Sequence, residues 1–497
     1  MIVLSEARLL ISSPFVFSRS DFILSPAHPL VAIYRLKSMA NTAGSRQSIY
    51  PFSPAYVTAS GRRSEDILEL LTPESRVSTK ALALLLSSPA YFGDFVPIPP
   101  WEGISCERSA FTWHPRIKGS DDCLQGRPDL AATFLQSVHD LTRHANGIAV
   151  AFSGGLDSTA VLCAATKLAQ EKAVPIYALT SEQITDDGNA IAASASRLAA
   201  AISDKVVHVA TTQICEPEWD PRGPCLQAMP WSTAGLMHAA QELGVDVVLA
   251  GAGADEALGS PRYLLPHLTD SARRAWRYTR LVCENGWYGP ICEALHLLSL
   301  PLPRRYRNLL YMATNYPQMH EVSPKEVLTA PLRQLCEDWE QMHYKALIDH
   351  HEATFDDWAS ADAYDTLFPL ELPVSSSSLA IEYPFLTSTF LPSALGLPVH
   401  ERFSASHATS YHQRKAAVLA LIPERIWPAL PHQKATFRES IAKQPAPDSD
   451  KIRLVFELGI VDRTAYAAPA AEEFRPTVLA IERWLQQALA RGHQVAT

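Results

Sequence analysis

The stretch "AVAFSGGLDSTAVLCAA", residues 149–165, decides how the rest of the chain is interpreted. Two apolar runs flank a turn that holds two adjacent glycines, two serines, a threonine and an aspartate. An apolar run of strand length, followed by small residues and a longer apolar run, predicts a strand, a turn and a helix. We expect the strand over 147–152 and the helix over 158–172.

The same alternation continues along the chain. Apolar runs predict further strands over 174–180, 205–210 and 245–250, with helices over 188–202 and 232–243 between them. Continuously apolar strands separated by helices indicate a parallel sheet that is covered on both faces. Ligands of such sheets bind outside the carboxyl ends of the strands, where the glycine-rich turn falls.

The flanking regions have a different pattern. Residues 1–115 contain short apolar runs broken by Pro, Ser and Gly, which predicts mostly β structure with helix near "SEDILELL" and "TKALALLL". A segment near 119–130 has the composition of a linker, and the chain from 265 onward is predicted to be mainly helical. A chain of 497 residues is expected to form about two or three domains.

Composition excludes several classes of protein. Hydrophobic residues make up 47% and charged residues 19%, as in a soluble globular enzyme. A net charge of −9 argues against a nucleic-acid partner, because phosphate binding needs clustered cations. The eight cysteines contain no CxxC pair, and neither a secretory signal nor a membrane-length apolar run is evident, so we expect a cytoplasmic protein.

The turn has the chemistry of a phosphate cradle. Gly154 and Gly155 let the backbone approach an anion, while Ser153, Ser158 and Thr159 offer hydroxyl donors at a helix start that favours negative charge. The GK[ST] ending of a Walker loop is absent, and Asp157 stands inside the turn instead. A carboxylate beside phosphates predicts an intervening Mg²⁺. The alternative is a glycine–serine helix cap that binds no ligand.

Two segments resemble known families. "SGGLDS", residues 153–158, is similar to the pyrophosphate loop of the ATP pyrophosphatase superfamily. "VDVVLAGAGADEALGSPRY", residues 245–263, resembles a segment of the asparagine synthetases. The resemblance implies that Asp157 and Asp255 jointly hold Mg²⁺ on ATP; an acidic pair at a helix start is the alternative for Asp255 and Glu256. The implied ATP and pyrophosphate contacts are Ser153, Gly154, Gly155, Leu156, Asp157, Ser158, Thr159, Leu179, Gly251 and Gly253.

A third similarity lies further along the chain. "IEYPFLTSTFL" (381–391) and "RKAAVLALIPERIWPALPHQKATF" (414–437) resemble the tail of the same family. The resemblance places Lys434 on a lysine that contacts the α-phosphate and a later oxyanion, and Glu382 is a candidate to accept the amine proton. For both residues the alternative is a solvated or ion-paired side chain. Arg414 and Lys415 are candidate pyrophosphate contacts or simply a basic pair at a helix start.

Several positions where this sequence differs from the asparagine synthetases indicate which type of synthetase it resembles. Residue 2 is Ile2, where glutamine-dependent asparagine synthetases need a cysteine, and residues 89–115 only faintly resemble the end of their glutaminase domain. Ala252 replaces a glutamate, and Thr387 replaces the aspartate after "PFL". The combination resembles the lasso peptide cyclases. The implied architecture is α/β, with a degenerate Ntn-type glutaminase-like α+β domain over 1–118 and a parallel-sheet pyrophosphate-loop synthetase domain over 125–497 that ends in a helical part.

The implied reaction forms an isopeptide bond and releases AMP and pyrophosphate. An Asp or Glu side chain of a ribosomal precursor peptide is adenylated, and the N-terminal amine of the peptide then closes a macrolactam. Implied partners are the precursor, a leader peptidase and a leader-binding protein, with no nucleic acid and no membrane. The basic, aromatic segments 272–280 and 304–311 are candidates for contact with an acidic precursor or leader. Rival interpretations are a small-molecule amide synthetase of the asparagine or β-lactam type, and a non-catalytic protein that keeps the nucleotide fold.

Overall fold

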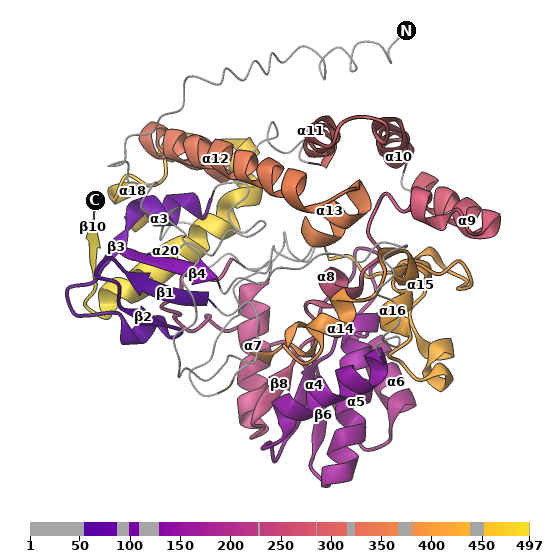
Figure 1. Cartoon of the computed structure of the whole chain (residues 1–497). Helices are drawn as coiled ribbons and strands as arrows, with labels where there is room; N and C mark the ends of the chain where they lie inside the picture. Colours follow the sequence, from indigo (N-terminus) through magenta and orange to yellow (C-terminus); the bar gives the residue numbers. More distant parts are fainter. Residues whose placement is uncertain are drawn as a thin grey trace. The chain divides into compact units, whose positions relative to one another are not determined.

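The central sheet of the computed structural model has five parallel strands in the order β7-β6-β5-β8-β9 (Figure 1). The first four are the strands predicted from the sequence, and a short fifth strand joins the edge beside β8. In chain order the strands are β5 (Ile148–Ala151), β6 (Ile176–Ser181), β7 (Val206–Thr211), β8 (Val247–Leu249) and β9 (Ile381–Glu382). The prediction of a parallel sheet is therefore confirmed.

The structure describes residues 54–86, 99–108, 129–226, 229–284, 286–315, 324–365, 379, 381–437 and 452–496. These residues belong to one compact unit, Ser45–Thr497. Ile2 and the predicted domain boundary between 118 and 125 lie outside the described ranges, so the division into two domains stays a prediction.

Helices cover both faces of the sheet because successive strand residues point to opposite sides. Ile148 and Val150 of β5 pack into one core, whereas Ala149 between them packs into another. The first core receives α4 (Leu130–Thr142), α5 (Leu156–Lys172) and α6 (Ile191–Ile202), and the second receives α7 (Pro230–Glu242). The continuously apolar strands of the sequence are explained by this double coverage.

The chain beyond the fourth strand is mainly helical, as predicted. Its α-helices are α8 (Ala254–Leu258), α9 (Ala272–Cys283), α10 (Tyr288–Ser299), α11 (Arg304–Asn315), α12 (Ala330–Thr354), α13 (Trp358–Asp365), α14 (Leu391–Leu395), α15 (Ser410–Arg414), α16 (Ala416–Leu419), α18 (Leu454–Glu457), α19 (Arg463–Ala467) and α20 (Arg475–Ala490). Short 3₁₀ turns are η1 (Ile67–Glu69), η2 (Leu265–Leu268), η4 (Pro324–Val327), η5 (Pro384–Leu386), η6 (Val399–Arg402), η7 (Glu424–Ala429) and η9 (Pro469–Phe474).

The described part of the N-terminal region is a small antiparallel sheet in the order β2-β1-β4, with a separate strand and helix beside it. These elements are β1 (Pro54–Thr58), β2 (Arg63–Ser64), β3 (Arg76–Ser78), α3 (Thr79–Leu84) and β4 (Ile104–Arg108). The helix expected at "SEDILELL" is only the 3₁₀ turn η1, and a turn closed by the Ser75 N–H and the Thr72 carbonyl begins three residues after it.

The C-terminal end of the chain packs against this N-terminal region (Figure 1). Strand β10 (Gln494–Ala496) pairs in parallel with β3. The buried Trp101 meets Trp484 of α20 edge-on at 5.7 Å and donates its indole N–H to the Pro221 carbonyl at 2.6 Å. The two ends of the described chain thus share one core of aromatic side chains.

Candidate active site

The predicted pyrophosphate loop runs from the end of β5 into the first turn of α5. Gly154 has φ +76°, a left-handed conformation that glycine adopts at little cost, and Gly155 is the N-cap of the helix. The Gly155 carbonyl accepts hydrogen bonds from the hydroxyls of Ser158 at 3.1 Å and Thr159 at 2.7 Å. The loop is therefore held by its own hydroxyl groups while the first helical N–H groups point out of the helix start.

Glycine is also required where the second motif meets this loop. A Cβ atom on Gly251 would lie 2.8 Å from the Ser158 nitrogen and 2.9 Å from the Asp157 carbonyl carbon. Gly253 has φ +90°, and a Cβ there would lie 2.5 Å from the Leu386 side chain in η5. The three segments that resemble the synthetases therefore pack directly on one another.

A charge cluster lies where these segments meet. The Lys415 ammonium donates to the two carboxylate oxygens of Asp157 at 2.6 and 2.7 Å and also pairs with Asp255. Lys434 reaches the other oxygen of Asp255 at 3.2 Å. The Lys415 side chain is 5% exposed and that of Lys434 is 67% exposed. The structure thus brings together both predicted metal ligands and the predicted catalytic lysine.

Opposing effects fix the protonation states of this cluster. Burial would lower the pKa of Lys415, but the neighbouring carboxylates of Asp157 and Asp255 outweigh it and raise that pKa. Burial would raise the pKa of Asp255, but Lys415 and Lys434 hold it below its usual value. For Asp157, burial prevails over Lys415 and the pKa is raised. Lys415 and Asp255 are therefore charged at neutral pH.

The donor set fits a magnesium ion that is shared with phosphate. Asp157 and Asp255 lie in the first turns of two different helices, α5 and α8, yet their carboxylates converge on a single cationic nitrogen, the Lys415 ammonium. Mg²⁺ is commonly bound through one or two carboxylates, with water and substrate phosphate as its other ligands. Among the described residues, no group of three or more His, Cys, Asp or Glu side chains could hold a metal alone. The site thus suits a cation that arrives with a nucleotide.

The remaining predicted residues lie on or next to the same edge. The Glu382 carbonyl accepts from the Ala250 N–H at 2.9 Å, so β9 holds this half-buried residue beside the loop that carries Asp255. The side chains of Leu156 and Leu179 are 0% and 1% exposed and pack in the two cores. Any contact of these two leucines with ATP would use the backbone, and their role stays a prediction.

Sequence reasoning missed two features of the site. Lys415, predicted to be a pyrophosphate contact or part of a basic pair at a helix start, lies at the centre of the charge cluster. Tyr411 was not considered at all, although its hydroxyl accepts the Leu156 N–H at 3.4 Å at the start of α5. The four-residue spacing of Tyr411 and Lys415, one turn of helix, was the available signal. A further bond, from the Asp186 N–H to the Thr436 carbonyl at 2.9 Å, ties the loop after β6 to the segment that carries Lys434.

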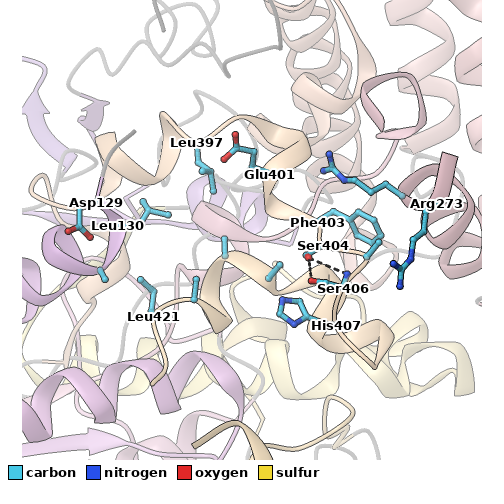
Figure 2. Close-up of a pocket in the computed structure, with 16 residues that line it drawn as sticks. Asp129, Leu130, Arg273, Leu397, Glu401, Phe403, Ser404, Ser406, His407 and Leu421 are labelled. Carbon is cyan, nitrogen blue, oxygen red and sulfur yellow. Dashed lines mark hydrogen bonds between the residues drawn. The ribbon is translucent and has the colours of Figure 1, made fainter. Parts of the chain in front are cut away.

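A cavity of about 710 Å³ lies apart from these residues (Figure 2). It is lined by the first residues of α4 and α9, by α16 and by the segment 397–407. Its charged and polar groups include Asp129, Arg273, Arg274, Glu401 and His407. Ser404 and Ser406 also line it and hydrogen-bond to each other at 2.7 Å. None of the predicted site residues lines it, so the cavity is separate from the charge cluster.

Comparison with known families agrees with this geometry. The sequence model of the asparagine synthase family matches residues 129–449, a range that includes every residue of the candidate site. The chain therefore belongs to the asparagine synthase family. Enzymes of this family are ATP-dependent, amide-forming ligases that typically use Mg²⁺. No curated protein matches the chain. In the part of the chain that the structure describes, no helix has the length and apolar character needed to cross a membrane.

Proposed function

We propose that this protein is an ATP-dependent cyclase that forms the macrolactam of a lasso peptide and releases AMP and pyrophosphate. The ATP chemistry is inferred from the carboxylates of Asp157 and Asp255, which both contact the Lys415 ammonium beside the loop at 153–158. A large, amine-bearing peptide substrate is favoured by the departures from the small-substrate synthetases at Ala252 and Thr387.

In the first step, a side-chain carboxylate of the precursor attacks the α-phosphate of ATP, and pyrophosphate leaves. Backbone N–H groups at the start of α5 and the hydroxyls of Ser153 and Ser158 bind the departing phosphates. Asp157 and Asp255 would hold a Mg²⁺ ion, which when bound would neutralise charge on the phosphates. The exposed ammonium of Lys434 stabilises charge at the α-phosphate. Lys415 keeps the two acids oriented toward each other.

In the second step, the N-terminal amine of the peptide attacks the acyl-adenylate and displaces AMP. Glu382 accepts the amine proton from its position on β9 next to the Asp255 loop. Both reacting groups belong to one peptide, so the protein contributes mainly by holding that peptide folded, which lowers the entropic cost of ring closure.

The wider setting belongs to the same proposal. The region over 1–118 is a degenerate glutaminase-like domain retained for packing or substrate binding, and a leader peptidase and a leader-binding protein act with the enzyme. The location is the cytoplasm. The absence of a CxxC pair among the eight cysteines of the sequence supports a reducing compartment.

The test uses ATP, Mg²⁺ and the short precursor peptide encoded beside the gene. We expect a peptide product lighter by one water, formed together with AMP. Asp157→Ala and Asp255→Ala each abolish both products. Asp246→Ala keeps them, because Asp246 precedes β8 at the amino ends of the strands, away from the site at their carboxyl ends. Pyrophosphate release that depends on aspartate and ammonium, without a peptide product, would instead establish a small-molecule amide synthetase.

A further inference from the structure

Helices α9, α10 and α11 carry an unusual exposed surface, which we call the arginine–aromatic face and define as residues 271–315. Twelve of the seventeen large hydrophobic side chains that are exposed in the described structure lie here. The segment holds seven arginines and two glutamates, with no lysine and no aspartate, in a chain of net charge −9. Soluble proteins rarely leave such an apolar surface uncovered unless it binds something.

The arginines of this face lie on α9 and α11, whereas α10 carries none and exposes apolar side chains. Helix α10 packs against both α9 and α11, and its outward side chains include Ile291 at 44% and Leu298 at 72% exposure. Helix α9 presents Trp276, 67% exposed, between Arg273 and Arg280. The three helices follow one another along one edge of the structure (Figure 1). The face is thus an apolar ridge with cationic margins.

The margins hold cations that the described part of the chain does not neutralise. Three arginines of the face pair with acids: Arg274 with Asp270 at 3.2 Å, Arg280 with Glu284 at 3.9 Å and Arg304 with Asp356 at 3.0 Å. Arg273 and Arg305 form no ion pair with any described residue. The other glutamate of the segment, Glu293, is buried and accepts a hydrogen bond from Tyr278. The exposed charge of the face is therefore positive.

The residue types identify the class of partner. Arginine, tryptophan and tyrosine are enriched at the centres of protein–protein interfaces and lysine is depleted there, which is the composition of this face. Arginine also pairs with carboxylates in a two-pronged geometry that lysine cannot make. We propose that the arginine–aromatic face docks an amphipathic helix of a partner protein, with an apolar stripe on α10 and acidic side chains toward α9 and α11.

The cavity described above extends this surface. Arg273 belongs both to the face and to the lining of the 710 Å³ cavity at the start of α9 (Figure 2). Interfaces are strongest where an anchoring side chain fills a pocket near exposed apolar residues. A partner helix that lies along α9 and α10 would therefore end with an anchor residue in this cavity.

The test uses a synthetic 18-residue helical peptide with leucines at i, i+3, i+4 and i+7 and glutamates on both sides of the stripe. The control peptide has lysine in place of every glutamate. Binding to the full chain is measured by fluorescence anisotropy without ATP, so failure here leaves the proposed reaction untouched. We expect the acidic peptide to bind at least about tenfold more tightly than the basic peptide.

Variants of the protein locate the binding to this face. Leu298→Ser and Arg305→Glu each weaken the acidic peptide about tenfold or more, whereas Ile214→Ser, at a 51% exposed site elsewhere, leaves binding unchanged. Equal affinity for both peptides would overturn the proposal. So would tighter, Leu298-dependent binding to phosphatidylglycerol vesicles, or a dimer in sedimentation that Leu298→Ser dissociates, because these outcomes assign the face to lipid or to a second copy.

Discussion

Two polar clusters in this molecule differ in whether their environment favours the charged or the neutral forms of their ionisable side chains. At the edge of the sheet, Lys415 is almost fully buried yet charged, and the side chains of Asp157 and Asp255 remain 25% and 46% exposed. Among the helices, Glu293 and His296 are buried, and burial raises the pKa of the first and lowers that of the second to about 4. The cluster at the sheet thus contains charged side chains, whereas burial among the helices favours the neutral forms of Glu293 and His296.

The contacts explain the difference. Glu293 accepts hydrogen bonds from the Tyr278 hydroxyl at 2.5 Å and the Tyr263 N–H at 2.8 Å, and His296 stacks on Trp358 at 5.2 Å. A buried charge is costly unless it is paired, so a cluster that only packs favours neutral forms. In the sheet-edge cluster, Lys415 and Asp255 retain their charges because they pair with each other, and the partly exposed carboxylates of Asp157 and Asp255 are accessible to a ligand. This contrast predicts which substitutions change activity and which change stability.

The largest expected effect is on activity at the sheet edge. Asp157→Asn removes one of two carboxylates and should reduce AMP formation about 1000-fold, which corresponds to about 4 kcal/mol. The free energy of unfolding should change by no more than about 1 kcal/mol, because the Asp157 side chain is 25% exposed and Lys415 keeps Asp255 as a partner. Asp246→Asn is the control, since Asp246 accepts from the Asn146 and Gly147 N–H groups at the amino ends of β8 and β5, away from the site. An Asp157→Asn variant with wild-type turnover would contradict the assignment of ATP chemistry to the cluster of Asp157, Asp255 and Lys415.

The next effect is on the pH dependence of stability. Burial lowers the pKa of His296 from 6.5 to about 4, so below pH 6.5 the unfolded chain binds a proton that the folded chain does not. The free energy of unfolding should therefore fall by up to about 3 kcal/mol as the pH drops from 6.5 to 4. His296→Phe removes this fall, measured by urea unfolding at pH 7 and 4.5.

The control for this measurement is the exposed His144. His144→Phe should leave the pH dependence of unfolding as it is in the wild type. Both ring nitrogens of His296 are buried without a hydrogen-bond partner among the described residues, so the aromatic replacement loses no bond. If His296→Phe kept the full loss of stability in acid, His296 would not be the neutral, packing residue described above.

A smaller effect is expected where the two loops of the site touch. Gly251→Ala forces a Cβ atom to within 2.8 Å of the Ser158 nitrogen, so the loops must separate at a cost of about 1–3 kcal/mol. We expect the KM for ATP to rise and the melting temperature to fall. Gly147→Ala is the control, because its Cβ would be no closer than 3.4 Å to any neighbour. Unchanged ATP affinity in Gly251→Ala would show that loop contact does not shape the site.

The smallest effect concerns Tyr411. Its hydroxyl accepts only a long bond of 3.4 Å from the Leu156 N–H, so Tyr411→Phe should cost at most about 1 kcal/mol. That loss corresponds to an increase of up to about fivefold in the KM for ATP, with kcat unchanged. A large fall in kcat measured under saturating ATP would mean that Tyr411 contacts the reacting groups.

The sequence was sufficient for the features that arise from local patterns. Apolar runs placed four strands of the sheet, and glycines beside aspartates identified the two loops that meet at its edge. Lys415 could not be recognised in this way, because it stands 258 positions from Asp157 and only tertiary folding brings the pair together. The short edge strand β9 was also missed, since two residues carry no periodic signal.

The central claim is that Asp157 and Asp255 together hold a divalent cation when ATP is bound. The most direct test is electron paramagnetic resonance of Mn²⁺, a spectroscopic substitute for Mg²⁺, titrated into the full chain with and without ATP. The account predicts one Mn²⁺ bound per chain in an ATP-dependent manner, and loss of that binding in both Asp157→Asn and Asp255→Asn. Undiminished ATP-dependent Mn²⁺ binding in the two variants would contradict it.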